Sequence, residues 1–368
     1  MDNTKIGNKE AIALLTTISF NQLIVGGAKF IISRCSSASL LNLLYISLIA
    51  IVVAGIMCYF LNNFPSYDLI DISNFLGGKY FKWIICIIYI AYFFLWTGNL
   101  LHMFSTSLQI IYFSQTSLFF IKLFILMSVI ITCLFKNNAV YRSTFIIFPL
   151  ILISTLFLFV SDIKFFYIEN IYPMLGNGFF STFFGGLSNL LIFQVLTYFF
   201  FFPTLLKNPF EIRKVTIYSI IISSILNILC VATVLFTSNT FFEVNELIPL
   251  YAAVKLIDYG AFFQKMDSIF FLIWIICFIA YLSITIKVSS NILKRLFYSN
   301  SDSFFVILCS ILLLIASCWQ KSYAMSICFI EHFLKYAFFI LVFVVPTLIL
   351  IFATLKQKIA RWIKWVKI

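Results

Sequence analysis

Ten apolar runs, each close to the length that a lipid bilayer requires, dominate this 368-residue chain. Hydrophobic residues make up 63% of it and charged residues only 10%. A soluble fold does not need repeated runs of about 20 apolar residues, so the sequence predicts an all-α polytopic membrane protein with ten transmembrane helices. The runs cover approximately residues 11–33, 38–61, 81–103, 117–135, 144–161, 179–203, 215–237, 268–288, 304–319 and 333–354.

The positive charges predict how the chain is oriented in the membrane. Lys and Arg concentrate in the N-terminal segment, in every second connecting segment and in the C-terminal tail. Because these residues mark the cytoplasmic side, we expect both termini to be cytoplasmic. The formal charge of +12 then reflects orientation in the lipid bilayer, and we expect no nucleic-acid partner. No small-residue cleavage site follows the first run, so we expect no removable signal peptide.

The sixth run, extended to residues 178–203, predicts a helix that is interrupted inside the membrane. Gly185 and Gly186 lie near its first third, and Ser188 and Asn189 follow as candidate caps for a second half-helix. Irregular backbone at membrane depth persists only where protein or a polar cavity satisfies its free N–H and C=O groups. The interruption therefore predicts a binding pocket.

The first run repeats this device. Gly26 and Gly27 follow Asn21 near its middle, and the apolar pattern continues to about Ser33. Two interrupted helices, each opening one half of the chain, are typical of transporters built from inverted repeats. The sequence thus predicts a single membrane domain built from two five-helix repeats, in which helices one and six are broken. The first repeat spans residues 1–161, the second spans 178–354, and a cytoplasmic amphipathic tail follows over 355–368.

The predicted pocket has a chemistry that suits a small amino acid. Paired glycines allow backbone to approach a ligand, and the N-terminus of a half-helix offers N–H donors and a partial positive charge to a carboxylate. The third run adds a stripe of Tyr89, Tyr92 and Trp96, and the eighth adds one that contains Tyr281 and Thr285. Aromatic packing and anchoring at the membrane surface explain the same stripes without a ligand.

Eleven residues are the candidate ligand contacts from these observations. They are Asn21, Gly26, Gly27, Tyr92, Trp96, Gly185, Gly186, Ser188, Asn189, Tyr281 and Thr285.

The sequence shows no pattern typical of an enzyme. The two histidines, His102 and His332, have no Cys, Asp or Glu at ligand spacing, and neither belongs to a recognisable triad. The nine cysteines lie mostly in apolar runs without paired spacing and are expected to pack as small hydrophobes. We expect no catalytic residue, no metal site and no cofactor.

Charged side chains are missing from the middle of every predicted span. Lys122 lies near the outer end of span four, where it is expected to reach the membrane surface, and Lys287 lies at the inner end of span eight. Proton-coupled carriers usually hold an ionisable residue inside the membrane, so we do not expect proton coupling. Coupling to Na⁺ through carbonyls and hydroxyls such as those of Ser154 and Thr155 stays open.

Two polar segments flank the predicted bundle. Residues 250–259 form an amphipathic stretch within the long outer connection, and they predict either a short helix over the pocket's mouth or an ordered connector. Residues 355–368 place apolar side chains on one face and basic ones on the others, which predicts a helix along the inner leaflet. A partner-docking role is the alternative for this tail.

The chain resembles the B subunits of spore nutrient-germinant receptors, which belong to the amino acid/polyamine/organocation transporter superfamily. The resemblance rests on the order and spacing of three segments: Ile171–Gly178 before the broken helix, Gln264–Asp267 before Trp274, and Val345–Ile349 in the last span. It covers essentially the whole chain. Family members often carry an acid where Gln194 stands and Arg where Lys265 stands, and these differences bear on which germinant is recognised.

The resemblance implies a LeuT-type fold and a place in the spore inner membrane. It also implies partners, namely a large A subunit and a lipoprotein C subunit, and a role in sensing an amino acid or similar nutrient without necessarily transporting it. An amino-acid permease that truly transports is the second hypothesis. A scaffold with a vestigial pocket is the third.

Overall fold

The computed structural model describes residues 5–135, 139–237, 248–257, 266–299 and 301–366, and side chains as far as residue 358. Within these ranges all regular elements are helices, and one isolated bridge pairs Ile6 with Leu206. The predicted all-α architecture is therefore confirmed for the described chain.

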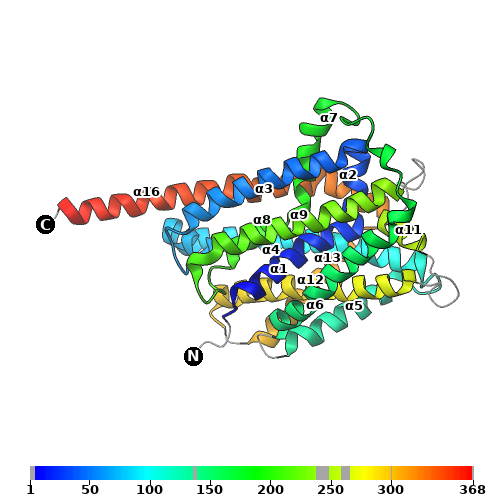
Figure 1. Cartoon of the computed structure of the whole chain (residues 1–368). Coiled ribbons are helices and arrows are strands. Elements are labelled where there is room, and N and C mark those ends of the chain that lie inside the picture. Colours follow the sequence, from blue (N-terminus) through cyan, green and yellow to red (C-terminus); the bar gives the residue numbers. More distant parts are fainter. Residues whose placement is uncertain (1–4, 136–138, 238–247, 258–265, 300, 367–368) are drawn as a thin grey trace.

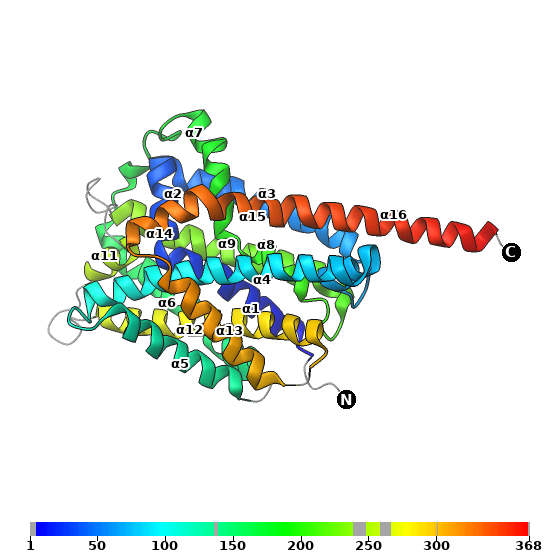
Figure 2. The same ribbon diagram turned by 180° about the vertical axis from the view of Figure 1, so that it is seen from behind.

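The long helices run side by side in one bundle (Figure 1). Both chain termini lie at the same end, which we call the terminal end, and we call the opposite end the distal end. Figure 2 shows the bundle from behind, with α4, α13 and α5 toward the viewer. The long helices are α1 (Asn8–Gln22), α2 (Ala28–Cys35), α3 (Ser39–Leu61), α4 (Leu69–Ile111), α5 (Leu118–Leu134), α6 (Ala139–Asp162), α9 (Ile212–Thr237), α12 (Met266–Phe297), α13 (Asp302–Cys318) and α16 (Val345–Val366).

Helices occupy all ten predicted intervals, but they differ in how well they suit a membrane crossing. Six helical stretches of the described chain are long and apolar enough to cross a bilayer, and a bent pair would add a seventh. Helices α5 and α13 are shorter apolar helices of 10–17 residues. A multi-pass membrane protein is therefore supported, while the ten-span count and the five-plus-five repeat stay predictions.

Burial separates central helices from peripheral ones. The most apolar stretches of α4, α9 and α12 are 67–72% buried, whereas that of α6 is 28% buried. Eleven of the twelve residues from Ala11 to Gln22 of α1 are buried as well, with Ile12 the exception, so the first broken helix runs through the core. Because lipid is as apolar as a side chain, this burial reflects close packing among helices rather than exclusion from water.

The N-terminal part of α4 is an arm that a glycine bends away from the rest of the helix. Gly78 has φ 73° and ψ −165°, which is not helical. Lys356 of α16 donates from Nζ to the carbonyl oxygens of Phe75 and Leu76, at 2.8 and 3.0 Å. The lysine thus satisfies carbonyls at the bend, and the arm is attached to the last helix.

The C-terminal tail continues the last span without a bend, and its predicted place along the inner leaflet stays a prediction. Residues 345–366 form one continuous helix, and Figures 1 and 2 show it projecting from the terminal end along the axis of the last span. Apolar spacing alone does not distinguish a helix that turns along a membrane from one that continues straight. The side chains of residues 359–368 lie outside the described part.

The predicted short helix in the outer connection is α11 (Pro249–Lys255), which packs against α9 and α12. Tyr251 donates from its hydroxyl to Asp267 Oδ2 at 3.0 Å, which ties α11 to the start of α12. Residues 258–265 of this connection, with Lys265, lie outside the described part.

Candidate ligand-binding site between the two broken helices

The first helix breaks where its glycine pair predicts. Helices α1 and α2 are joined by a π turn over Leu23–Gly27, in which Gly26 has φ 120° and ψ −1°. This left-handed conformation strains any residue with a side chain. A Cβ on Gly26 would also lie 3.2 Å from Tyr323 Oη and 3.4 Å from Met103 Cε. The predicted interruption is confirmed, and glycine is required there.

The second helix breaks in a different place from the one predicted. Helix α7 (Phe179–Phe183) ends directly before the glycine pair, and the 3₁₀ helix η5 (Gly185–Ile192) carries the chain through both glycines without a sharp bend. The bend of 59° falls at Phe193, with φ −84° and ψ 61°, just before α8 (Val195–Tyr198). The α-helical geometry therefore ends at the predicted glycine pair, but the predicted break in direction does not lie there.

Gly186 is needed for packing. A Cβ at this position would lie only 2.0 Å from Asn42 Nδ2 of α3, so the missing side chain makes room for the asparagine. Asn42 Nδ2 donates to Thr182 O at 2.8 Å, and Asn42 Oδ1 accepts from Asn189 Nδ2 at 2.9 Å. Gly185 is exposed, with its nearest Cβ neighbour, Phe180 O, at 3.9 Å. Neither glycine lies at the break.

Ser188 and Asn189 do not cap the half-helix after the break, as was predicted. The Ser188 hydroxyl donates to Gly185 O at 2.6 Å, on its own 3₁₀ helix. The backbone N–H of Val195, which begins that half-helix, instead donates to Ser19 Oγ of α1 at 3.3 Å. The first broken helix thus satisfies a backbone group that the second break sets free.

A cluster of uncharged polar side chains joins the two broken helices to α4. Trp96 donates from Nε1 to Gln22 Oε1 at 2.8 Å, and Tyr92 donates from its hydroxyl to Gln194 Oε1 at 3.1 Å. The rings of Tyr92 and Trp96 stack with centroids 6.1 Å apart. The stripe predicted on the third run is therefore directed at both breaks, whereas Tyr89 donates to Leu341 O of the last span.

Helix α12 closes this cluster from the other side. Asn21 donates from Nδ2 to Cys277 O at 3.2 Å, and the hydroxyls of Tyr198 and Thr285 lie 2.9 Å apart. Tyr281 Oη faces the side chains of Gln22 and Tyr198. The structure thus brings together five predicted residues, Asn21, Tyr92, Trp96, Tyr281 and Thr285.

Two polar atoms of the cluster lack hydrogen bonds. Within the described chain, neither Asn21 Oδ1 nor Tyr281 Oη has a partner of good geometry, although both residues are completely buried. Buried polar groups are rarely left unpaired, and a pair of such atoms suits a polar ligand or ordered water.

A small cavity extends from this cluster toward the distal end. It holds about 30 Å³, where a single water needs about 10–15 Å³ on the same measure, so an amino acid requires the walls to part. The predicted residues Gly27, Trp96, Ser188 and Asn189 contribute to its lining. No residue of α11 does, which favours the connector interpretation of that helix over the lid.

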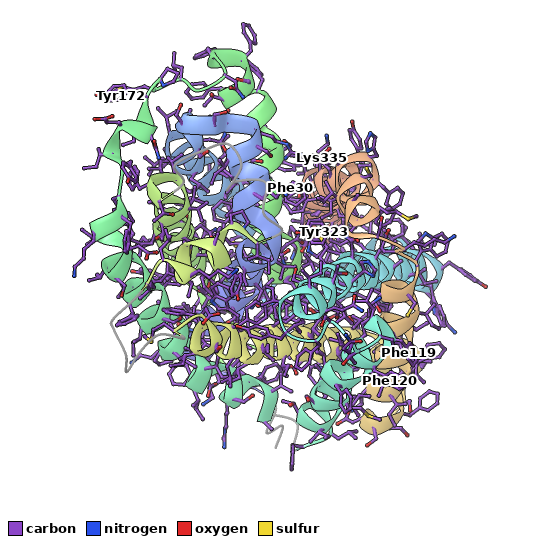
Figure 3. All side chains as sticks on the ribbon, turned by 90° about the vertical axis from the view of Figure 1, so that its right-hand side faces the viewer. Phe30, Phe119, Phe120, Tyr172, Tyr323 and Lys335 are labelled. Carbon is purple, nitrogen blue, oxygen red and sulfur yellow. The ribbon has the colours of Figure 1, made fainter. Side chains whose placement is uncertain are left out.

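Arg34 closes the distal side of the cavity. Its guanidinium donates to Asn189 Oδ1 at 3.0 Å and to Glu331 Oε1 at 3.1 Å. Glu331 lies on the π turn Ile330–Leu334, between α14 (Tyr323–Phe329) and α15 (Lys335–Phe339). Figure 3 looks onto this end, with Phe30 of α2 beside the segment that carries Tyr323 and Lys335, and with Phe119 and Phe120 farther away on α5.

At the terminal end, a backbone bridge joins the two broken helices. Ile6 N donates to Leu205 O at 2.8 Å, and Lys207 N donates to Ile6 O at 3.0 Å. Both Ile6 and Leu206 are buried. The segment before α1 and the segment after the second broken helix are therefore held together.

The contacts of Lys122 decide one prediction about a polar residue, while coupling to Na⁺ through Ser154 and Thr155 stays a prediction. Lys122 does not reach the surface: it is 3% exposed and donates to Ser317 O at 2.7 Å, with its Nζ 2.9 Å from His102 Nδ1. The hydroxyls of Ser154 and Thr155 donate to Ile151 O of their own helix. The predicted exit of the Lys122 side chain to the membrane surface is wrong because two acceptors lie within its reach inside the bundle.

Sequence reasoning missed several members of the site. Gln22 was hidden beside Asn21, and its place among apolar residues was the only signal. Ser19, Tyr198 and Arg34 have no distinctive spacing, since their partners lie on other helices, 87 to 297 residues away in the chain. Such contacts depend on tertiary packing.

The family comparison agrees with this architecture. A family model described as "Spore germination protein", the spore permease family, matches residues 14–325. The chain belongs to this family. No match to a curated protein was found.

Solved transporters share the fold of this chain. Mhp1, a nucleobase-cation-symport-1 family transporter in a closed conformation with bromovinylhydantoin bound, is similar with a TM-score of 0.71 and 12% identity, over 93% of this chain and 78% of that one. A Na⁺-coupled sialic acid symporter in a substrate-bound outward-open state gives 0.62 and 10%, over 93% and 80%. Inward-facing Mhp1 gives 0.59 and 12%, over 92% and 74%. The fold is that of LeuT-type transporters.

Proposed function

We propose that this chain is the germinant-sensing integral membrane subunit of a spore nutrient receptor, and that it binds an amino acid or similar small nutrient between its two broken helices. The observation that carries the proposal is a pair of completely buried polar atoms at the junction of the breaks, Asn21 Oδ1 and Tyr281 Oη, neither of which has a hydrogen bond of good geometry within the described residues. Membership in the spore germination family gives that ligand its biological context.

Binding changes the shape of the bundle. The cavity of about 30 Å³ admits an amino acid only if the α2 segment, η5 and the last span separate. Arg34 joins these elements through Asn189 and Glu331, so a ligand that enters must loosen or re-form that contact. The ligand then favours one of two bundle conformations, and this population shift is the signal.

The remainder of the receptor reads this shift. We place the terminal end, with both chain termini, in the cytoplasm of the spore, and the bundle in the spore inner membrane beside an A subunit and a lipoprotein C subunit. The basic connecting segments support that orientation. Labelling of an engineered single cysteine at each end of the bundle, in intact membranes, tests it.

A binding measurement on the purified chain tests the central site. Tyr281→Phe removes one unpartnered hydroxyl, and we expect it to weaken amino-acid binding by up to about tenfold, as loss of one hydrogen bond does. Tyr89→Phe is the matched control, because the Tyr89 hydroxyl bonds to Leu341 O away from the cluster. Equal affinities of the two variants would exclude this site.

Transport is the second candidate function, and the LeuT-type fold favours it. Proteoliposomes that contain the chain separate the two functions. Saturable, gradient-driven uptake of a labelled amino acid identifies a permease, whereas binding without flux identifies a sensor. The same Tyr281→Phe variant must reduce whichever activity is found.

A further inference from the structure

A second, larger cavity lies near the terminal end of the bundle. It holds about 200 Å³, several times the volume of the central one. Phe201 and Val288 in its wall follow Tyr198 and Thr285 by one helical turn, so it begins directly beyond the hydrogen bond between those two hydroxyls. The lining residues are Asp68, Phe201, Thr204, Leu205, Val288, Asn291, Ile292, Lys294 and Arg295.

This cavity contains charges of both signs, which the central cluster lacks. The Asp68 side chain is completely buried, and it accepts hydrogen bonds from Asp71 N at 2.9 Å and from Arg295. Arg295 also donates to Asp71 Oδ2 at 3.1 Å, while its own side chain is 36% exposed. The Arg295 guanidinium therefore lines the cavity, and the Asp68 carboxylate lies fully buried against it. Lys294 also lines the cavity, and its ammonium group is paired with Asp302.

From this geometry we propose that the cavity is a second binding site, selective for small zwitterions such as free amino acids. The ligand carboxylate pairs with Arg295, and its ammonium group pairs with Asp68. Both contacts are charge-assisted hydrogen bonds, and the planar guanidinium suits a carboxylate. A zwitterion inserted between the two side chains keeps both charges paired, so the buried Asp68 carboxylate is not left without a partner.

Occupancy of this site couples to the position of α12. The direct contact between Arg295 and Asp68 holds the end of α12 to the start of the α4 arm. An inserted zwitterion increases the distance between the Arg295 and Asp68 side chains. Asp71 is not part of the cavity lining, so Arg295 can keep its contact with the Asp71 carboxylate. The site stands on these residues alone, so it does not depend on whether the central cluster binds the same ligand.

The site is also sensitive to pH. Burial raises the pKa of the Asp68 carboxyl to about 6, with Arg295 opposing and Asp71 reinforcing the shift. The other titratable groups around it are Lys294 of α12, which lines the same cavity, and Lys82 and the Cys86 thiol of α4. Below pH 6 the carboxyl is neutral and no longer balances an ammonium group. Zwitterion affinity is therefore constant above about pH 7 and falls as pH drops through 6.

The test uses calorimetric titration of the purified full-length chain with L-alanine, ethylamine and propionate. We expect L-alanine to bind in the cavity at least tenfold more tightly than either single-charge analogue. Asp68→Asn should remove this difference and its pH dependence. Asp71→Asn is the matched control. It removes a negatively charged partner of Arg295 that lies outside the cavity lining, and it should change L-alanine affinity by no more than about twofold.

A second variant keeps the result decisive if Asp68→Asn does not fold. Thr204→Leu fills the cavity without changing a charge and should weaken L-alanine binding to it. The proposal is overturned if both Asp68→Asn and Thr204→Leu bind L-alanine as the unmodified chain does. It is equally overturned if ethylamine and propionate bind as tightly as L-alanine.

Discussion

The two broken helices reach a similar result by different means. The first bends at Gly26, whose φ of 120° requires glycine. The second bends at Phe193, whose φ of −84° is open to any residue, and its free N–H at Val195 is accepted by Ser19 of the first helix. A glycine pair therefore marks a break in one helix and a close helix contact in the other.

This contrast teaches that glycine in a membrane helix has two separate uses. It permits a left-handed backbone, and it lets a neighbouring element approach. Gly26 serves the first use and Gly186 the second, because its Cβ would collide with Asn42. Only the structure separates the two, since both pairs have the same letters in the sequence.

The largest effect is expected at Gly26. Gly26→Ala forces a side chain into a left-handed conformation and toward Tyr323 Oη, so it should lower the free energy of unfolding by about 3 kcal/mol. Amino-acid binding should fall with it, because the break is displaced. Chemical unfolding in detergent micelles measures the first quantity and calorimetry the second. If the Gly26→Ala variant has the stability of the unmodified chain, the backbone at this position relaxes easily.

A smaller loss is expected at Gly186, and its cause can be isolated. Gly186→Ala pushes Asn42 from its hydrogen bond with Thr182 O and should cost about 2 kcal/mol, as overpacking does. In the Asn42→Ala background the same change should cost much less, because the colliding atoms are gone. A double-mutant cycle on unfolding free energies measures this coupling. Additive costs would contradict a direct clash.

Removing the hydrogen bond that links the two breaks should lower the free energy of unfolding by a moderate amount. Ser19→Ala leaves the Val195 N–H without its acceptor and should destabilise the chain by about 1 kcal/mol. Ser223→Ala is the control, since that buried hydroxyl donates only to Ile220 O of its own helix. If both serine variants unfold at the same denaturant concentration, the second break does not rely on the first helix.

The smallest effect is expected at Gly185. This residue is exposed, and a Cβ would meet only Phe180 O at 3.9 Å. Gly185→Ala should therefore change the free energy of unfolding by less than about 0.5 kcal/mol and leave binding unchanged. A large loss of binding in this variant would restore the original prediction that the second break lies at the glycine pair.

Much of the fold follows from local sequence. Runs of apolar residues predict the helices, because a bilayer sets their length, and Gly26 predicts the first break. The two stripes, one with Tyr92 and Trp96 and the other with Tyr281, predict two walls of the site, since residues one turn apart share a face. These features depend on short stretches of chain.

The remainder depends on contacts between distant segments. The second break lies at Phe193, and no local property of Phe193 or Gln194 distinguishes it from a continuous helix. Lys122 lies buried because α4 and α13 supply its acceptors, although its sequence position is close to a helix end. Whether a polar side chain finds a partner is a property of the packed bundle.

The bridge between Ile6 and Leu206 bears on how the chain is assembled during synthesis. Ile6 is synthesised about 200 residues before Leu206, so a long loop must close before the bridge forms. Until then, the leading end of the polypeptide has no fixed position in the nascent bundle. A fusion protein joined to this end would interfere with a late folding step, and a purification tag is better placed at the carboxyl end.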